Sequence, residues 1–572
     1  MELPEPVTVL DYGAGNIRSL LNALKKHGVE PRFVKSAADI AQASKLIFPG
    51  VGAFGQSMNA LEKMGYTEAL RAYLKSNRPF LGICLGLQTL YEGSEESPGV
   101  AGLGAFSGVV RDLNNVKVDE PLTVPHMGWN EIRRQRASKL FAAGDQTEST
   151  SGRYYFTHSF AIPAAEADAT DVLATTDHGV PFVSVVQRGN IVATQFHPEK
   201  SGEAGLDLIR RFLQDFPYPE PSSPVPFQCL VQGPTVLARR VIACLDVRSN
   251  DAGDLVVTKG EQYDVRERAT EENGATKRGE VRNLGKPVDL ARRYFQEGAD
   301  EVVFLNITSF RDSPLHDQPM LDVLRRTSEH VFVPLCVGGG IRDITVPAAA
   351  SSTDGGAAGD SITYPAVEVA GEYFRSGADK VSIGSDAVRA AVEYMQSGAK
   401  TGKTAIETIA EVYGSQAVVI SVDPKRAYAQ SPADVPGKQH CIETKYPGPD
   451  GEMYCWYQCT TAGGRVTTDV GAWEMVRACE ALGAGEIMLN CINRDGTNAG
   501  YDLELIADIK SAVRIPVIAS SGAGCPEHFS EVFAATGCDA ALAAGIFHRK
   551  EVPIGAVKEH LNVKEVTVRY NP

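Results

Sequence analysis

The 572-residue sequence predicts two α/β domains in tandem, an open sheet followed by a (β/α)8 barrel. Three observations support this prediction. The first 215 residues alternate apolar, strand-like runs with amphipathic, helix-like runs. A proline-rich stretch at 216–237 then interrupts regular structure. The rest of the chain, 238–572, contains a twofold repeat whose matching members lie about 180 residues apart.

Composition narrows the class of protein. The net charge of −15 and the pI near 5.3 disfavour a nucleic-acid partner, because phosphate backbones bind positive surfaces. The N-terminal residues show no basic leader and no long apolar stretch, so we expect neither a signal peptide nor a membrane partner. Eleven cysteines, an odd number, indicate reduced thiols. We therefore expect a cytoplasmic protein that acts on small molecules.

Four strand-like runs mark the first domain, 1–215. They are PVTVLDYG (6–13), KLIFPG (45–50), RPFLGICLG (78–86) and VVQRGNIVATQFHPE (185–199). Between the first two lies IRSLLNALKKHG, whose apolar residues recur with helical spacing. This alternation, without an internal repeat, is typical of an open α/β sheet.

The segment LGICLGLQ (81–88) places Cys84 between two glycines at a predicted strand-to-helix turn. Small neighbours allow a sharp turn of the kind that exposes a nucleophile, and the following helix would stabilise a thiolate. A single cysteine is more often a buried core thiol, so this interpretation depends on partner residues.

Two further segments supply such partners. His197 and Glu199, in VATQFHPEKS, are two residues apart on a predicted strand, so we expect their side chains on the same face. Together with Cys84 they form a Cys-His-acid set. The loop PGVGAFG (49–55) is glycine-rich and follows a strand, where its N–H groups can face an oxyanion, although a plain βα turn is the alternative.

With these motifs, residues 7–213 resemble the class I (triad) glutamine amidotransferases. The resemblance implies that Cys84 attacks the side-chain amide of glutamine, that His197 transfers the proton and that Glu199 orients His197. The motifs DYGAGN (11–16) and PHMGWN (125–130) narrow the resemblance to the glutaminases of histidine biosynthesis. The implied oxyanion and glutamine-binding residues are Gly50, Val51, Gly52, Gln88, Thr157, His158 and Ser159.

Eight strand-and-helix pairs make up the repeat in 238–572, which is the number in a (β/α)8 barrel. The matching strands are VIACLDV (241–247) with AVVISVDPK (417–425), VPLCVGGGI (333–341) with IPVIASSGA (515–523), and the strands after GAD at 298, GAD at 377, GAG at 483 and GCD at 537. The stretches 345–364 and 429–455 break the rhythm, and we expect partly mobile inserted loops there. Cys455 and Cys459 lack a second ligand pair, which favours an ordinary surface loop over a metal site.

Three acids follow predicted barrel strands: Asp246 in ACLDV, Asp423 in SVDPK and Asp495 in NRDGT. Barrel active sites lie at the C-terminal ends of the strands. Asp246 and Asp423 hold equivalent places in the two halves, so we expect them to face each other and to act as a general acid/base pair. A single acid in such a loop is more often only a solvated cap.

Glycine-rich turns occur in matching positions of the two halves, CVGGGIRD with IGSDAV and ASSGAG with AAGIFH. Backbone N–H groups beside helix N-termini hold phosphate without net positive charge. Two such pairs predict two phosphates on opposite sides of the barrel mouth. The predicted phosphate-binding residues are Lys259, Gly339, Gly340, Gly384, Ser385, Gly496, Gly522, Ala544 and Gly545.

The second domain resembles the cyclase of imidazole glycerol phosphate synthase, and the whole chain resembles the fused, fungal or plant type of that family. The resemblance implies that ammonia attacks a bis-phosphorylated substrate, phosphoribulosyl-formimino aminoimidazole carboxamide ribonucleotide. The products would be imidazole glycerol phosphate and aminoimidazole carboxamide ribonucleotide, with no cofactor and no metal. Asn306 departs from the pattern, because single-function cyclases usually carry Asp there. Since both domains share one chain, we expect a monomer.

Four charged residues begin predicted barrel strands: Arg240, Glu301, Lys380 and Glu486. Ordinary solvated turns would explain them, but alternating signs also permit a ring at the bottom of the barrel. In the family that the chain resembles, the corresponding charges gate a passage for ammonia.

Two alternative functions of the whole chain stay open at this point. One is an amidotransferase with another acceptor, and the other is a non-catalytic sensor of phosphorylated metabolites.

Overall fold

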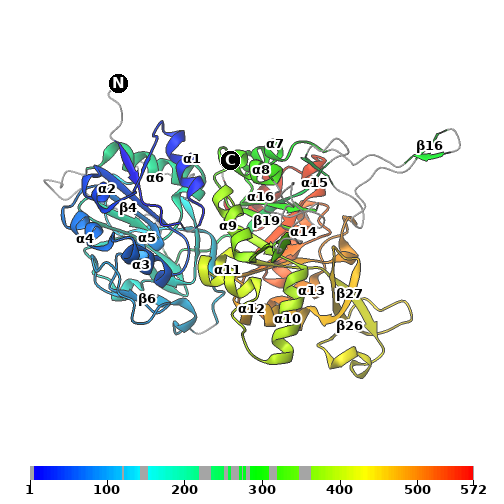
Figure 1. Cartoon of the computed structure of the whole chain (residues 1–572). Coiled ribbons are helices and arrows are strands. Elements are labelled where there is room, and N and C mark those ends of the chain that lie inside the picture. Colours follow the sequence, from blue (N-terminus) through cyan, green and yellow to red (C-terminus); the bar gives the residue numbers. More distant parts are fainter. Residues whose placement is uncertain are drawn as a thin grey trace, which may run out of the picture.

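The computed structural model describes residues 6–13, 15–118, 121–141, 152–217, 233–249, 255–258, 270–272, 275–277, 284–307, 318–346 and 362–570. Most of the proline-rich stretch, Lys259 and residues 347–361 of the first insertion lie outside this set. Figure 1 shows two α/β domains side by side, the first in blue to cyan and the second in green to red.

An eight-stranded sheet forms the N-terminal domain, in the order β2-β1-β3-β4-β13-β12-β11-β8. Neighbouring strands from β2 to β13 run parallel, whereas β12 and β11 run antiparallel. The predicted open α/β sheet is confirmed. The strands are β1 (Val7–Val9), β2 (Arg32–Phe33), β3 (Lys45–Gly50), β4 (Phe80–Cys84), β8 (Arg133–Arg134), β11 (Val172–His178), β12 (Val180–Arg188) and β13 (Ile191–Thr194).

The predicted strand at 185–199 is wrong in its extent. It divides into β12 and β13, which Gly189 and Asn190 join, and β13 ends at Thr194. Gly189 has a φ of 57°, which suits a tight turn between antiparallel strands. His197 and Glu199 therefore lie beyond the sheet, on a turn and the 3-10 helix η3 (Pro198–Lys200).

Helices cover both faces of this sheet (Figure 1). α1 shows why they form: Asn16 caps its first turn by accepting from Ser19 N, and Leu20, Ala23 and Leu24 form a buried stripe. The helices are α1 (Ile17–Lys26), α2 (Ala37–Gln42), α3 (Phe54–Lys63), α4 (Thr67–Lys75), α5 (Leu85–Gln88) and α6 (Gly202–Asp215). Smaller strands are β5 (Gly93–Ser94), β6 (Val109–Asp112) and β10 (Phe160–Ala161), with the antiparallel pair β7 (His126–Glu131) and β9 (Arg153–His158).

Eight parallel strands form the second domain, and pairing of β14 with β30 closes them into a barrel. The predicted (β/α)8 barrel is confirmed, with all eight strands in the predicted segments. In barrel order they are β14 (Arg240–Ser249), β18 (Glu301–Asn306), β19 (Leu335–Gly338), β22 (Lys380–Ile383), β23 (Val418–Val422), β28 (Glu486–Asn490), β29 (Val517–Ser520) and β30 (Ala540–Ala543). Their inward side chains, Val419 and Met488 among them, fill the interior.

Ten helices among the described residues surround the barrel, and glycines end several of them as predicted. Gly377, Gly483 and Gly537 adopt left-handed conformations directly after helices. The helices are α7 (Pro287–Gln296), α8 (Gln318–Ser328), α9 (Ala366–Ser376), α10 (Ser385–Ser397), α11 (Ala405–Tyr413), α12 (Ala472–Leu482), α13 (Leu503–Ala512), α14 (Pro526–Thr536), α15 (Gly545–His548) and α16 (Ile554–Val563). No helix in the described part of the chain has the length and apolarity that a membrane crossing requires.

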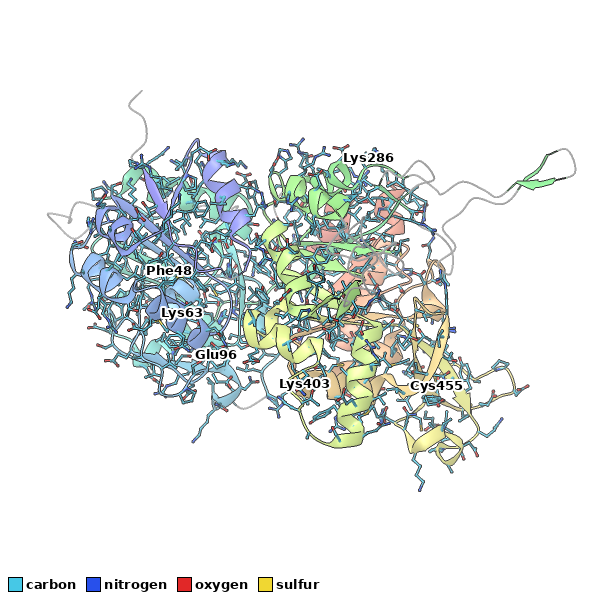
Figure 2. The ribbon with its side chains drawn as sticks, in the orientation of Figure 1. Phe48, Lys63, Glu96, Lys286, Lys403 and Cys455 are labelled. Atoms are coloured by element: carbon cyan, nitrogen blue, oxygen red, sulfur yellow. The ribbon has the colours of Figure 1, made fainter. Side chains whose placement is uncertain are left out.

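The second insertion is a folded sheet and not the partly mobile loop that we expected. β24 (Pro424–Ala429), β25 (Ile442–Glu443) and β27 (Val466–Gly471) each pair with β26 (Tyr454–Thr461). Arg426 anchors the sheet, since its Nε and Nη2 donate to Asp502 at 2.7 and 2.6 Å. The surface-loop interpretation of Cys455 and Cys459 is also wrong, because both are fully buried on β26. Figure 2 shows Cys455 on this inserted sheet.

Three short strand pairs complete the described barrel domain. β15 (Leu255–Val257) pairs with the end of β14. β20 (Ile344–Val346) pairs with β21 (Ile362–Tyr364) on either side of residues 347–361. β16 (Thr270–Glu272) and β17 (Ala275–Lys277) form a hairpin that extends away from the barrel (Figure 1).

The N-terminal domain covers the end of the barrel where the strands begin. Trp129 Nε1 donates to Asp300 O at 3.1 Å, and Asp300 directly precedes β18. Val124 N donates to Arg514 O at 3.1 Å, and Gly202 N donates to Phe332 O at 3.0 Å. Arg514 and Phe332 lie shortly before β29 and β19. The bottom of the barrel therefore faces the other domain and not bulk solvent.

Because Gly50 and Gly86 have no side chains, β3, β4 and α5 approach one another closely. A Cβ on Gly86 would lie 2.1 Å from Phe48 O, and one on Gly50 would lie 2.5 Å from Leu85 Cβ. Both distances are far below van der Waals contact. The glycines around Cys84 are thus required by backbone packing as well as by the turn.

We expect Gly86→Ala to lower the free energy of unfolding by about 3 kcal/mol, because the new methyl group forces the carbonyl of Phe48 aside. Urea unfolding of the full chain measures the loss. Gly93→Ala is the matched control in the same domain, since its Cβ would meet no atom closer than 3.5 Å. Equal losses in the two variants would contradict this explanation.

Candidate functional site

Cys84 ends β4 with φ 52° and ψ −102°, a strained conformation for a residue with a side chain. Such a backbone turns the side chain out of the sheet, as a nucleophile on an elbow requires. The predicted helix does follow, but it is short, because α5 ends at Gln88 after four residues. The dipole of so short a helix adds little stabilisation to a thiolate.

His197 and Glu199 meet each other although they do not share a strand. His197 Nδ1 lies 2.8 Å from Glu199 Oε1, and both side chains are buried. His197 Nε2 is buried without a hydrogen bond to any described residue. Burial by itself would lower the pKa of His197, but Glu199 and Cys84 outweigh it and raise that pKa well above its usual value. The arrangement favours a charged imidazole beside a thiolate.

The predicted oxyanion loop lies beside this group. Gly50 pairs with Cys84 across β3 and β4, and Gly52 has a φ of 122°, which only glycine adopts without strain. Tyr12 Oη donates to Val51 O at 3.1 Å. Thr157 Oγ1 is buried and makes no hydrogen bond with a described residue. The loop and the end of β9 therefore present polar groups near the triad.

A cavity of about 30 Å³ lies between the two domains. Val51, Thr157, His197 and Glu199 line it from the N-terminal domain. Asp379 and Lys380, with Phe374 and Gln416 among others, line it from the barrel. His197 and Glu199 thus face a cavity that reaches the bottom of the barrel.

Arg240, Glu301, Lys380 and Glu486 form a closed, buried ring at the bottom of the barrel, and the alternative of solvated turns is wrong. Lys380 Nζ lies 2.6 Å from Glu301 Oε1 and 2.6 Å from Glu486 Oε2. Arg240 lies 3.0 Å from Glu301 Oε2 and 2.5 Å from Glu486 Oε1. Burial would lower the pKa of Lys380, but the two carboxylates outweigh it and raise that pKa, so the ammonium stays charged.

Sequence reasoning missed the contacts that attach the triad segment to this ring. Lys200 follows Glu199, and its Nζ lies 2.6 Å from Asp379 Oδ2. Asn16 Nδ2 donates to Asp379 Oδ1 at 2.8 Å. Lys380 Nζ also lies 3.7 Å from Met127 Sδ. Both Lys200 and Asn16 stand inside motifs recognised from the sequence, HPEK and DYGAGN, but no pattern indicated their partner.

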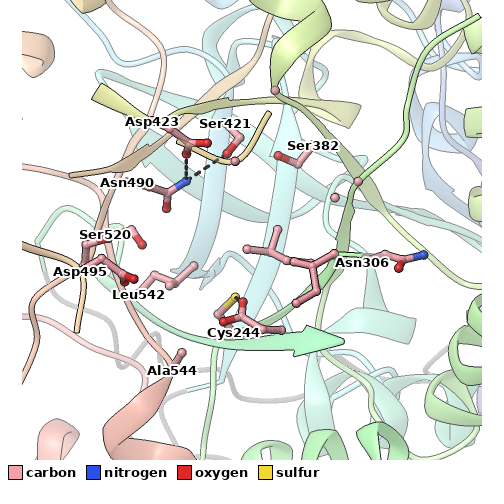
Figure 3. A pocket seen from close by; sticks show the side chains of 18 of the residues that line it. Cys244, Asn306, Ser382, Ser421, Asp423, Asn490, Asp495, Ser520, Leu542 and Ala544 are labelled. Atoms are coloured by element: carbon pink, nitrogen blue, oxygen red, sulfur yellow. Dashed lines mark hydrogen bonds between the residues drawn. The ribbon is translucent and has the colours of Figure 1, made fainter. Parts of the chain in front are cut away.

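The barrel mouth holds a second cavity, of about 750 Å³ (Figure 3). Asp246, Asp423 and Asp495 all line it, as predicted. Asp246 lies on β14 and Asp423 follows β23, which are the first and fifth strands around the barrel. Because three strands separate β14 from β23 in either direction, the two carboxylates belong to opposite walls.

Asp423 has the environment of a group that exchanges protons near neutral pH. Burial raises its pKa to about 6, a hydrogen bond from Asn490 opposes this, and the charge of Asp495 adds to it. Asn490 Nδ2 donates to Asp423 Oδ1 at 2.9 Å and to Ser421 Oγ at 3.0 Å (Figure 3). Asn490 was not predicted, since an asparagine at the end of a strand carries no distinctive pattern.

The predicted phosphate-binding residues line the same cavity, except Lys259, which is outside the described residues. They occupy two opposite sides. Gly339 and Gly384 follow the third and fourth strands, and Gly522 and Gly545 follow the seventh and eighth. Ser382 Oγ, at the Gly384 side, is buried without a described hydrogen-bond partner. Four arginines that sequence reasoning did not select also line the mouth: Arg248, Arg342, Arg465 and Arg549.

Among the described residues, no group of three or more His, Cys, Asp or Glu side chains has the arrangement of a metal site. None of the ten described cysteines forms a disulfide bond.

Two family models match the chain, one per domain. The model described as glutamine amidotransferase class I matches residues 8–216. The model described as histidine biosynthesis protein matches residues 240–357 and 365–553. Each match coincides with one of the two domains in the structure.

Relatives with both domains match nearly the full chain. Imidazole glycerol phosphate synthase hisHF of Schizosaccharomyces pombe is 52% identical over 98% of this chain and 99% of its own length. This chain belongs to the imidazole glycerol phosphate synthase family. The chloroplastic hisHF member from Arabidopsis thaliana is also 52% identical, over 98% of this chain and 89% of its own length. The family subunit HisF from Methanosphaera stadtmanae is 37% identical over 58% of this chain, and all of that subunit is covered.

Membership in the imidazole glycerol phosphate synthase family makes this chain an enzyme of histidine biosynthesis. It combines a glutamine amidotransferase domain with a cyclase barrel, and it works by glutamine hydrolysis and ammonia channelling. The two alternatives, an amidotransferase with another acceptor domain and a non-catalytic sensor, are therefore excluded.

We expect the pH profile of the cyclase to reveal Asp423. With ammonia supplied at a constant unprotonated concentration, one limb of kcat/KM should have a midpoint near 6. Asn490→Ala removes a hydrogen bond that favours the ionised form, so that midpoint should rise. Asp495→Asn removes a neighbouring negative charge, so the midpoint should fall. Shifts in the same direction for both variants would show that the limb belongs to another group.

Proposed function

We propose that this chain hydrolyses glutamine at Cys84 and passes the ammonia through the barrel to a bis-phosphorylated ribonucleotide at the mouth. The position of Lys380 carries this proposal. Its side chain lines the cavity beside His197. Its strand, β22, ends at Ile383, and Gly384, the next residue, lines the mouth cavity. The two candidate sites therefore stand at opposite ends of the same strands.

In the first half-reaction the Cys84 thiolate attacks the side-chain carbonyl of glutamine. N–H groups of the loop at Gly50, Val51 and Gly52 stabilise the resulting oxyanion. His197 gives a proton to the leaving nitrogen, and ammonia departs from a glutamyl thioester. Water then attacks the thioester with His197 as base, which yields glutamate and restores the thiol. Glu199 keeps His197 oriented throughout.

In the second half-reaction ammonia attacks phosphoribulosyl-formimino aminoimidazole carboxamide ribonucleotide. Asp246 and Asp423, on opposite walls, transfer the protons that addition and ring closure require, and Asp495 assists. The two glycine-rich sides of the mouth hold the two phosphates. The products are imidazole glycerol phosphate and aminoimidazole carboxamide ribonucleotide.

Between the sites, the ring of Arg240, Glu301, Lys380 and Glu486 acts as the ammonia gate. Bulk water would protonate ammonia and remove its nucleophilic lone pair, so an enclosed route preserves reactivity. Lys380 is the member that lies on the triad side. Movement of its side chain would open the ring toward the barrel interior.

We further propose that the protein acts as a monomer in the cytoplasm. Both half-sites and their interface come from one chain, and the described cysteines form no disulfide bonds, as in a reducing compartment. Sedimentation of the purified chain tests the oligomeric state.

Cys84→Ala tests the assignment of the two half-reactions. We expect glutamine-dependent product formation to fall by about 10³-fold or more, because the nucleophile is lost. With ammonium salts the variant should keep its cyclase rate, and Asp246→Asn should lose cyclisation with either nitrogen source. Glutamate release and imidazole glycerol phosphate formation are measured in parallel. Retention of glutamine hydrolysis by Cys84→Ala would refute the proposal.

Lys380→Met tests the gate. We expect several glutamates per cyclised product in place of a ratio near one, since ammonia escapes before it reaches the mouth. Lys510→Met is the control, because Lys510 also makes an ion pair near the barrel floor, with Asp539 at 2.6 Å, but outside the ring. An unchanged ratio in Lys380→Met would remove the gate from the proposal.

A further inference from the structure

The sulfur of Cys84 receives a hydrogen bond from a residue that the reaction as described does not use. Gln195 Nε2 donates to Cys84 Sγ at 3.5 Å. Gln195 is fully buried, two residues before His197, on the segment between β13 and η3. An amide presents either a donor or an acceptor, depending on its rotation about the last bond. The environment of Gln195 therefore determines which of the two faces the sulfur.

Gln88 fixes that rotation. Its Nε2 donates to Gln195 Oε1 at 3.3 Å and to Phe160 O at 3.0 Å. Since Phe160 O is a backbone carbonyl and only accepts, Gln88 must direct its NH₂ group to this side. Gln195 then receives a donor at Oε1, and its own NH₂ group is left to face Cys84.

Two buried histidines hold the Phe160 segment. His158 Nδ1 lies 2.8 Å from Phe160 O, so Nδ1 carries the proton. Burial lowers the pKa of His158 to about 3, so the ring is neutral at pH 7 and Nε2 is an acceptor. His126 Nδ1 lies 3.1 Å from that Nε2 and donates to it. Burial also lowers the pKa of His126 well below its usual value.

Asn130 is the last residue in this series of hydrogen bonds, which runs from Cys84 through Gln195, Gln88, Phe160, His158 and His126. Its Nδ2 lies 3.1 Å from His126 Nε2, which must accept because the neutral ring has donated through Nδ1. Each hydrogen bond of the series thus permits one direction only. His126 and Asn130 belong to β7, the strand that carries Met127 and Trp129 to the barrel floor.

From this geometry we infer that Gln195 orients the Cys84 sulfur and stabilises its thiolate, and that His126 and His158 are positioning residues acting through Gln88 and Gln195. The inference rests on the proposed role of Cys84 as the nucleophile. A donor at the sulfur favours the charged form, whereas a rotated amide would present Oε1 and disfavour it. The buried series of hydrogen bonds prevents that rotation. It also connects Cys84 to β7, the strand whose Trp129 contacts the barrel.

Alkylation of Cys84 by iodoacetamide tests the inference without relying on turnover. The full chain is alkylated across a pH series, and the Cys84 adduct is quantified by peptide mass spectrometry. We expect Gln195→Leu to raise the pH midpoint by about one unit, a tenfold loss of thiolate below the midpoint. Gln195→Glu has almost the same shape but brings a negative charge to the sulfur, so its midpoint should rise further. A purely structural role would not separate Leu from Glu in this order.

Variants of His126 test the positioning role. His126→Phe should raise the midpoint by about half a unit, because the Phe160 segment and Gln88 lose their support. The double variant His126→Phe/Gln195→Leu should match Gln195→Leu alone, since His126 acts only through Gln195. His126→Gln, which keeps a donor and an acceptor, should recover most of the wild-type midpoint.

His178→Phe is the matched control. Its ring is tilted against that of His126, with 4.4 Å between centroids, but its Nε2 donates to Thr123 O, outside the series. The titratable groups that act on Cys84 or face it, His197, Glu199 and Tyr12, are unchanged in every variant. A shift in His178→Phe as large as in His126→Phe, or additive shifts in the double variant, would overturn the positioning role. An unshifted Gln195→Leu would overturn the role of Gln195.

The proposed function fails by a different result, namely glutamine hydrolysis that survives Cys84→Ala. Alkylation midpoints do not depend on that result, so the two failures are distinguishable.

Discussion

Two positive and two negative side chains are buried together at the bottom of the barrel, and the rest of the structure depends on this burial. Each of these ions loses several kcal/mol of hydration on leaving water, and only a well-formed set of partners repays that loss. Arg240 and Lys380 each contact both Glu301 and Glu486, so no charge is left alone. The ring stays dry because the N-terminal domain covers it, and that domain in turn needs the barrel to complete its own cavity.

This mutual requirement explains the density of polar contacts between the domains. Asp379 precedes the ring residue Lys380 and binds Lys200 and Asn16 from two different loops of the other domain. Lys200 directly follows Glu199. A displacement of β22 therefore reaches the triad segment within a few bonds. The geometry therefore joins the two sites mechanically, in addition to the proposed route for ammonia.

Much of the fold could be predicted because the sequence repeats the same physical pattern. Four matched pairs of apolar strands predict the eight barrel strands, and glycines such as Gly377 and Gly483 mark the helix ends. The extent of β13 and the fold of 424–471 could not be predicted. A run such as IVATQFHPE does not show where pairing ends, and the inserted sheet is stabilised by contacts distant in sequence, such as Arg426 with Asp502.

The site residues also divide into those that could be predicted from the sequence and those that could not. Cys84, His197 and Asp423 stand in recognisable local motifs, and the structure brings His197 to its expected neighbour and Asp423 to the mouth cavity. Gln195 and Asn490 act through partners that lie 111 and 67 residues away. Their own neighbours in sequence carry no signal of that contact. The charged ring is an intermediate case. Its four members could be selected from the sequence, but their burial could not be predicted from it.

The twofold character of the barrel has a consequence for how a substrate enters. If the glycine-rich turns hold phosphate as proposed, their matching places on opposite sides of the mouth would accept a molecule with a phosphate at each end in either of two directions. Only one direction brings the reacting carbon to the correct acid. The choice must come from features that differ between the two sides. Ala462 and Arg465 reach the Gly384 side from the inserted sheet, where Ala462 N donates to Ser385 Oγ, whereas Arg549 stands at the end of a helical turn beside Gly545. The inserted sheet thus makes the two sides of the barrel mouth chemically different. This difference would favour one direction of substrate binding over the other.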